Sequence, residues 1–302
     1  MEQRRLGKHG PEVPVICFGA WPIGGGLGHV DDATAIGTVQ YALDHGITFI
    51  DTAEAYRTSQ DLLGRALQGR RDRACIATKV SKGDLSRAHM LEAIEDSLRA
   101  LRTDYIDLYQ AHSFDAHHPI EETMRTFDDL VKSGKVRYIG VSNFNVEQME
   151  QALAVRWFDS LQPRYSMLFR EAEDDVLPFC HRQGIGVIVH SPLAKGLLTG
   201  SYTPESTFPA DDERSQMSNF QGETFARHLA RAGRLEAFAR DHGHTLVELA
   251  IAWTLANPAV TSCIVGAKRP AQIDAHIHAA DWKLSTDDLI EIDKLLATGP
   301  VT

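Results

Sequence analysis

The sequence predicts an α/β protein of the (β/α)8 TIM-barrel class, with residues 1–302 forming a single domain. Two observations lead to this prediction. Eight short runs rich in apolar and β-branched residues recur along the chain, and amphipathic helical stretches lie between most of them. Strands that are apolar throughout are typical of parallel sheets covered by helices, and eight is the number of parallel strands that closes into this barrel.

The expected strands and helices can be placed in order along the chain. The strands span 15–19, 47–51, 74–79, 105–110, 137–142, 159–162, 186–191 and 261–266. The clearest helical stretches span 31–46, 86–101, 119–134 and 172–184. Ser86 is a suitable N-cap, and Gly46 and Gly134 suit the position just after a helix. Pro178 lies inside the last stretch and weakens its helical pattern.

Three segments fall outside this strand–helix repeat. Residues 2–14 predict a short hairpin around Lys8-His9-Gly10 that plugs the bottom of the barrel. Residues 193–223, between the seventh and eighth strands, are rich in Ser, Thr, Pro and charge, and predict a mobile lid before two further helices. A C-terminal helix is expected over residues 284–297.

Composition and charge exclude several classes of protein. A formal net charge of −10 disfavours a nucleic-acid binder, because nothing concentrates positive charge for phosphates. The first residues contain no apolar segment of a secretory signal, and no run approaches the roughly 18 apolar residues of a membrane span. The cysteines are far apart and show no CxxC pairing: Cys17, Cys75, Cys180 and Cys263. We therefore expect a cytoplasmic protein with reduced thiols and no membrane partner.

Polar residues stand at the carboxyl ends of nearly all the expected strands, where (β/α)8 enzymes carry their chemistry. A strand end that served only the core would more often carry Val, Ala or Gly. From the second strand onward these ends carry Asp51 with Tyr56 in the following loop, Lys79, His112, Ser142 with Asn143, Gln162, His190, and Gly266 to Lys268. They converge on one mouth, which we interpret as an active site.

The first four of these residues make chemical sense as a group. A free tyrosine has a pKa of about 10 and is a poor acid at neutral pH. The Lys79 ammonium is expected to lower the pKa of Tyr56, and Asp51 to hold Lys79 in place. His112 can orient a substrate oxygen or relay a proton. Together these residues can donate a proton to a carbonyl oxygen. They include neither a nucleophile nor a set of metal ligands, so the second reactant must come from elsewhere, and a nicotinamide hydride would complete the reaction.

Ordered motifs over nearly the whole chain resemble the aldo-keto reductase family. They are DTAEAY (51–56), IATK (76–79), DLYQAH (107–112), GKVRYIGVSNF (134–144), LQPRYS (161–166), SPLAKGLLTG (191–200) and IVGAK (264–268). The resemblance implies hydride transfer between aldehydes, ketones or sugars and alcohols. It implies NADP(H) as the preferred cofactor with NAD(H) as the alternative, a small-molecule substrate, and no need for a metal.

The resemblance also implies roles for individual residues. The catalytic tetrad would be Asp51, Tyr56, Lys79 and His112. The nicotinamide carboxamide would be held by Ser142, Asn143 and Gln162, and the pyrophosphate path would be lined by Ser191, Leu193 and Lys195. Gly266, Lys268, Arg214 and Gln272 would serve the 2′-phosphate and adenine end. Trp21 and Phe114 are expected to shape the substrate pocket.

Three positions depart from the family's pattern, and they bear on cofactor preference more than on the reaction. His190 stands where the family usually stacks a tyrosine or another aromatic on the nicotinamide. His276 replaces an asparagine common at the adenine edge, and Ser201 stands where many members place a lysine.

Alternative interpretations remain open from the sequence. A reductase-like barrel can serve as a slow redox-sensing or regulatory subunit, and Lys79 could act as the nucleophile of a Schiff-base aldolase. The glycines of AWPIGGGLG (20–28) would suggest a dinucleotide-binding turn, but Trp21-Pro22 stand where the tight glycine turn should begin and the run does not match G-x-G-x-x-G.

Overall fold

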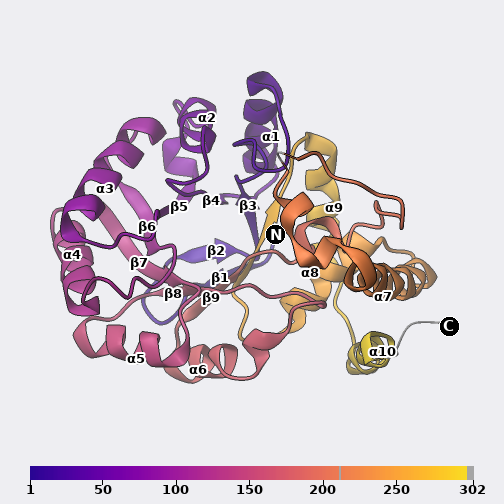
Figure 1. The fold of residues 1–302 in the computed structure, drawn as a ribbon. Coiled ribbons are helices and arrows are strands. Elements are labelled where there is room, and N and C mark those ends of the chain that lie inside the picture. Colours follow the sequence, from indigo (N-terminus) through magenta and orange to yellow (C-terminus); the bar gives the residue numbers. More distant parts are fainter. Residues whose placement is uncertain (211, 298–302) are drawn as a thin grey trace.

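Eight parallel strands close into a barrel in the computed structural model, which describes residues 1–210 and 212–297 (Figure 1). Strands that follow one another in sequence are neighbours in space, and β10 closes the ring against β3. The strands are β3 (Ile16–Gly19), β4 (Phe49–Asp51), β5 (Cys75–Val80), β6 (Ile106–Ala111), β7 (Val136–Ser142), β8 (Ser160–Gln162), β9 (Gly186–Val189) and β10 (Ser262–Gly266). The predicted barrel is confirmed, and each strand lies within its expected run or extends it by a single residue.

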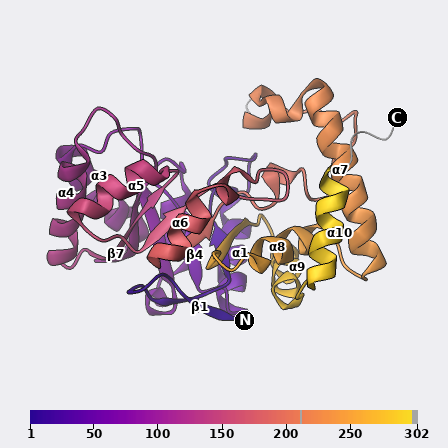
Figure 2. The same cartoon turned by 90° about the horizontal axis from the view of Figure 1, so that it is seen from below.

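Helices surround the barrel, and α7 and α10 pack against each other at one edge of the molecule (Figures 1 and 2). They are α1 (Asp32–Asp44), α2 (Ser59–Ala66), α3 (Arg87–Leu101), α4 (Ile120–Lys132), α5 (Val146–Val155), α6 (Val176–Gln183), α7 (Gly222–Asp241), α8 (Leu246–Ala256), α9 (Pro270–Asp281) and α10 (Thr286–Ala297). Ser86 caps α3 as predicted, because its hydroxyl accepts a hydrogen bond from the backbone N–H of His89. Since α6 begins at Val176, Pro178 lies in its first turn, where a missing N–H breaks no helical bond.

The N-terminal hairpin closes one end of the barrel. β1 (Gln3–Arg5) pairs antiparallel with β2 (Glu12–Pro14), and Figure 1 shows the pair lying across the barrel opening. Leu6 and Val13 are fully buried and pack against apolar side chains from the barrel strands. Gly7 permits this close approach: its φ is +70°, and a Cβ there would lie 2.7 Å from the carbonyl oxygen of Asp159.

The barrel interior is arranged in two layers along the strands. The layer next to the hairpin is apolar and contains Cys17, Phe49, Ala77, Leu108, Ile188 and Ile264. Two residues further along the same strands stand Gly19, Asp51, Lys79, Gln110, His190 and Gly266. Because side chains alternate across a strand, residues two apart point to the same side. The upper layer therefore brings polar groups together at the carboxyl ends of the strands.

The lid segment lies between β9 and α7, and its described residues, 193–210 and 212–221, include the short 3-10 turns η3 (Ala194–Gly196), η4 (Glu213–Gln216) and η5 (Ser218–Phe220). Its aromatic residues form a small cluster with the first turns of α7. The ring of Phe208 lies 5.3 Å from that of Tyr202 and 5.2 Å from that of Phe220, and Phe225 of α7 joins them. This segment therefore has an apolar anchor of its own beside the carboxyl ends of the strands.

Two further expectations concern the whole chain. All four cysteines are free thiols, and Cys17, Cys180 and Cys263 are buried. Within residues 1–210 and 212–297, every helix is too short or too polar to cross a membrane.

Candidate active site

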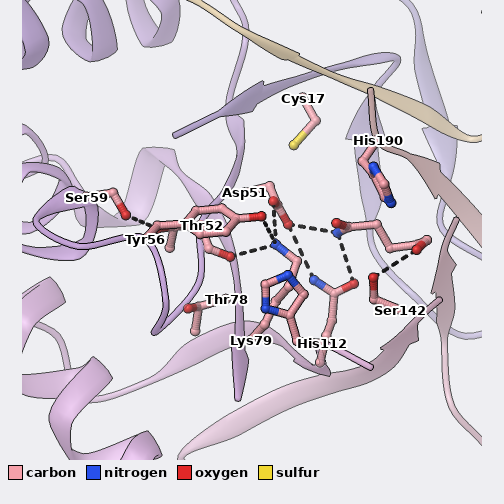
Figure 3. Close-up of polar contacts among 12 residues, drawn as sticks. Cys17, Asp51, Thr52, Tyr56, Ser59, Thr78, Lys79, His112, Ser142 and His190 are labelled. Atoms are coloured by element: carbon pink, nitrogen blue, oxygen red, sulfur yellow. Dashed lines mark hydrogen bonds and ion pairs between the residues drawn. The ribbon is translucent and has the colours of Figure 1, made fainter. Parts of the chain in front are cut away.

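A buried ion pair forms the floor of the site, between the ends of β4 and β5 (Figure 3). Lys79 Nζ donates to Asp51 Oδ1 at 2.6 Å and to the carbonyl oxygen of Thr52 at 2.8 Å. Burial alone would lower the pKa of Lys79, but the Asp51 carboxylate and Tyr56 more than offset it, so the pKa of Lys79 lies above its usual value. Lys79 is therefore a fixed cation at neutral pH.

Tyr56 reaches over this pair from the loop after β4. Lys79 Nζ donates to Tyr56 Oη at 3.5 Å, and the Trp21 ring packs edge-on at 4.9 Å between ring centroids. The structure corrects one expectation here. Burial raises the pKa of Tyr56 above its usual value, although the Lys79 ammonium opposes that rise. The lysine therefore limits the effect of burial and does not reverse it.

His112 follows β6 and faces Tyr56, with 5.8 Å between the two ring centroids. Its Nδ1 lies 2.7 Å from the hydroxyl oxygen of Ser81. Burial, assisted by the Lys79 charge, lowers the pKa of His112 to about 4. At neutral pH the imidazole is uncharged, so one of its nitrogens is a donor and the other an acceptor.

Amide and hydroxyl side chains occupy the other side of Asp51 (Figure 3). Gln162 Nε2 donates to Asp51 Oδ2 at 2.9 Å. Ser142 Oγ donates to the Gln162 carbonyl oxygen at 2.9 Å, and Asn143 Nδ2 donates to Ser142 Oγ at 3.0 Å. The predicted trio of Ser142, Asn143 and Gln162 therefore lies together at the ends of β7 and β8.

His190 continues this network at the end of β9. Its Nε2 lies 3.1 Å from Asn143 Oδ1, and its Nδ1 lies 3.0 Å from Ser191 Oγ. Burial, and then the Lys79 charge, lower the pKa of His190 to about 3, so the ring is neutral. Asn143 and Ser191 adopt left-handed backbone conformations, with φ of 58° and 60°. Such strained conformations cluster at functional sites.

A cavity of about 530 Å³ opens above this floor. The predicted residues that line it are Trp21, Asp51, Tyr56, His112, Ser142, Asn143, Gln162, His190, Ser191, Leu193, Lys195, Arg214, Gly266, Lys268 and Gln272. Lys79 is fully buried and bonded to Asp51 and Tyr56 in its wall. The structure does not bring Phe114 to this cavity, because its ring packs edge-on against Phe144 with 5.4 Å between centroids.

Positive charge gathers in the part of the cavity that the lid segment and β10 line. Arg214 Nε donates to Asp212 Oδ1 at 2.8 Å, and Lys268 Nζ contacts the carbonyl oxygen of Leu27. Burial, and then the Arg214 charge, lower the pKa of Lys268. The two cations are thus close enough to repel each other, and an anion bound there would relieve the repulsion.

The polar residues Ser81, Gln110 and Glu213 belong to the site and are missing from the sequence prediction. Gln110 and Ser81 stand two residues from His112 and Lys79 on the same strands, so strand alternation could have found them. Glu213 lies in the irregular lid segment, where it accepts from Trp21 Nε1 at 3.3 Å and from Lys195 Nζ at 2.6 Å. No periodic pattern marks it.

The donor set fits an elongated ligand with an amide at one end and phosphates at the other. The Ser142, Asn143 and Gln162 side chains offer amide and hydroxyl groups beside the Asp51–Lys79 ion pair. Lys268 offers positive charge further along the cavity, beside Lys195 and Arg214, which pair with Glu213 and Asp212. A nicotinamide dinucleotide has this distribution of groups.

Comparisons with known proteins agree with this geometry. The model of the aldo/keto reductase family matches residues 15–297. The aldo-keto reductase YhdN of Bacillus subtilis is 38% identical, covering 98% of this chain and 94% of the relative. A probable voltage-gated potassium channel subunit beta of Arabidopsis thaliana is 35% identical, covering 93% and 92%. Among solved structures, the glycerol dehydrogenase AKR11B4 from Gluconobacter oxydans superposes with a TM-score of 0.89 at 33% identity, covering 98% and 94%.

Proposed function

Because this chain belongs to the aldo/keto reductase family, we propose that Tyr56 is the general acid–base of its carbonyl–alcohol interconversion and that NADP(H) is its preferred cofactor. The chain is an oxidoreductase of a family that uses nicotinamide cofactors. The observation that carries the proposal is the contact of the Tyr56 hydroxyl with the fully buried Lys79 ammonium, which is paired with Asp51.

The proton transfer follows from this contact. When bound, the cofactor supplies a hydride to the carbonyl carbon. Tyr56 gives its phenolic proton to the carbonyl oxygen, and the resulting phenolate is stabilised by Lys79 Nζ. An alkoxide is far more basic than a phenolate, so Tyr56 donates downhill even with a raised pKa. Alcohol oxidation runs the same path in reverse.

His112 and Asp51 support this transfer without changing charge. Neutral His112 faces Tyr56 across the cavity and can donate a hydrogen bond to the substrate oxygen. Asp51 is fixed by Lys79 and Gln162, so the ammonium cannot swing away from Tyr56. Trp21 packs on the Tyr56 ring and forms the apolar wall of the substrate pocket.

The cofactor preference rests on the cationic part of the cavity. Ser142, Asn143 and Gln162 would hold the nicotinamide carboxamide, and Lys195 the pyrophosphate. Lys268 and Arg214 lie close enough to repel each other, so the 2′-phosphate that distinguishes NADPH from NADH has a favourable place between them. Arg214 is also paired with Asp212, which lowers the gain.

Titration of the protein with NADPH and with NADH, followed by tryptophan fluorescence, tests this preference without a known substrate, since Trp21 lies in the cavity wall. We expect tighter binding of NADPH. Lys268→Ala should weaken NADPH by about tenfold, or about 1.4 kcal/mol, and leave NADH unchanged. Lys283→Ala, which removes a surface lysine paired with Glu2, is the control. Equal loss for both cofactors, or failure of both to bind, contradicts the proposal.

A second candidate is a slow or non-turning-over regulatory barrel, since one relative is named as a potassium channel subunit. Turnover with simple aldehydes or with glycerol, above the rate of a Tyr56→Phe variant, would exclude it. The Schiff-base alternative is disfavoured, because a nucleophilic lysine must lose its proton and the pKa of Lys79 is raised. Borohydride trapping of a carbonyl compound at Lys79 would contradict this assessment.

A further inference from the structure

Ser81 makes a hydrogen bond to the site that the tetrad does not include. It stands one residue beyond β5 and two beyond Lys79, and it is 5% exposed. Its Oγ lies 2.7 Å from Nδ1 of His112, which stands one residue beyond β6. The backbone N–H of His112 donates to the Val80 carbonyl oxygen at 3.0 Å, so both residues are anchored to the same edge of the paired strands.

Ser81 is itself held by a carboxylate from the neighbouring loop. Its backbone N–H donates to Glu54 Oε2 at 2.9 Å, and the backbone N–H of Glu54 donates to the Lys79 carbonyl oxygen at 3.1 Å. Glu54 also pairs with Lys82 at 2.5 Å. Ser81 is therefore held by Glu54, from the loop after β4, and by His112, from the residue after β6.

The partner of Nδ1 decides what His112 presents to a substrate. A neutral imidazole carries one proton, so a proton on Nε2 leaves Nδ1 able only to accept a hydrogen bond. Within residues 1–210 and 212–297, Ser81 is the only side chain that bonds to the His112 ring, through Nδ1. Backbone carbonyls and carboxylates only accept, and would place the proton on Nδ1. A hydroxyl can either accept from Nδ1 or donate to it, and when it donates the ring proton stays on Nε2.

We propose that Ser81 is a positioning residue that donates its hydroxyl proton to His112 Nδ1, and so keeps Nε2 protonated and aimed at the carbonyl oxygen of the substrate. This inference rests on the proposed role of His112. It adds that the competence of His112 depends on a serine outside the tetrad, because a histidine with the opposite proton placement offers the carbonyl only a lone pair.

The test combines nitrogen NMR with turnover. In protein labelled with 15N-histidine, the wild-type His112 signals should show a protonated Nε2 and an unprotonated Nδ1. Ser81→Asp supplies a partner that only accepts, so the proton should move to Nδ1. Ser81→Ala should leave a mixture of tautomers, and Ser81→Thr should restore the wild-type pattern. Ser160→Ala is the matched control, since it removes a buried hydroxyl that has no hydrogen-bond partner.

The turnover number should depend on whether the His112 proton lies on Nε2. We expect kcat for carbonyl reduction to fall about tenfold in Ser81→Ala and about 100-fold or more in Ser81→Asp, with NADPH affinity unchanged. Ser81→Thr should recover most of the rate, and Ser160→Ala all of it. A protonated Nδ1 in the wild type, or wild-type nitrogen signals or wild-type turnover in both Ser81→Ala and Ser81→Asp, overturns the proposal.

The two proposals can fail separately. If the wild type turns over no carbonyl, the proposed function fails, yet the nitrogen signals of wild type and Ser81→Asp still report whether Ser81 places the proton. If one variant does not fold, the remaining variants carry the same comparison against Ser81→Thr.

Discussion

The two layers inside the barrel stand on the same strands, two residues apart, and differ in almost every physical property. The lower layer is apolar, sealed by Leu6 and Val13 of the hairpin. The upper layer holds the buried Asp51–Lys79 ion pair, Gln110 and the neutral His190. Burying charge is costly unless every group is bonded, and here the Asp51 carboxylate has Lys79 and Gln162 as partners. The apolar layer therefore stabilises the fold, and this stability offsets the cost of burying the charged groups of the upper layer.

The largest effect is expected where the upper layer meets the substrate. Tyr56→Phe should lower kcat by about 10²–10⁴-fold, the usual contribution of a general acid. Cofactor affinity and the unfolding free energy should change little, because the ring and its Trp21 contact remain. Steady-state kinetics, cofactor titration and urea unfolding measure the three quantities. Near-normal turnover would remove Tyr56 from its proposed role.

Lys79→Met removes the positive charge of the upper layer and keeps a side chain of similar size. Removing one partner leaves the Asp51 carboxylate buried without its cation, so we expect a loss of about 3–5 kcal/mol in unfolding free energy together with activity. The double variant Asp51→Asn with Lys79→Met should regain part of the stability and none of the turnover. A single variant as stable as the wild type would show that the pair is not compensating buried charge.

Leu108→Ala instead removes apolar volume from the lower layer and leaves the polar groups of the upper layer in place. We expect the free energy of unfolding, measured in urea, to fall by about 2–5 kcal/mol, because Leu108 is fully buried and packed in the apolar cluster with Leu6 and Val13. At temperatures where the variant is folded, kcat and cofactor affinity should match the wild type. A large fall in kcat of the folded variant would show that the layers are not separable.

The smallest effect concerns acid stability. His112, His190 and His276 have pKa values lowered by burial to about 4, 3 and 4, whereas an unfolded histidine titrates near 6.5. As pH falls below about 6.5, the unfolded chain takes up these protons first, so each histidine removes up to about 1.4 kcal/mol of stability per pH unit. The loss ends near each folded pKa. Urea unfolding between pH 7.5 and 4.5 should show a shallower slope for His276→Asn than for the wild type, and equal slopes would refute the assignment.

Much of this architecture could be predicted because strand physics is local. The eight apolar runs marked the barrel, and their polar ends marked the cavity. Helices α2 and α5, with 8 and 10 residues, are not among the helices that the sequence places, although α6 is equally short and is placed. The net direction of the Tyr56 pKa depends on how completely the fold buries the ring, and the orientation of Phe114 depends on the position of Phe144. Contacts between distant segments decide both.

The closure of the barrel has a consequence for how the chain folds. β10 pairs with β3, so Cys263 lies opposite Ile16 and the two ends of the sequence meet along one seam. Every other neighbouring pair of strands follows directly in sequence and can form early. The seam closes the longest loop in the molecule, which makes it the entropically most expensive contact. In a chain that lacks β10, the paired edges of β3 and β9 have no partner, and unpaired strand edges are prone to aggregation.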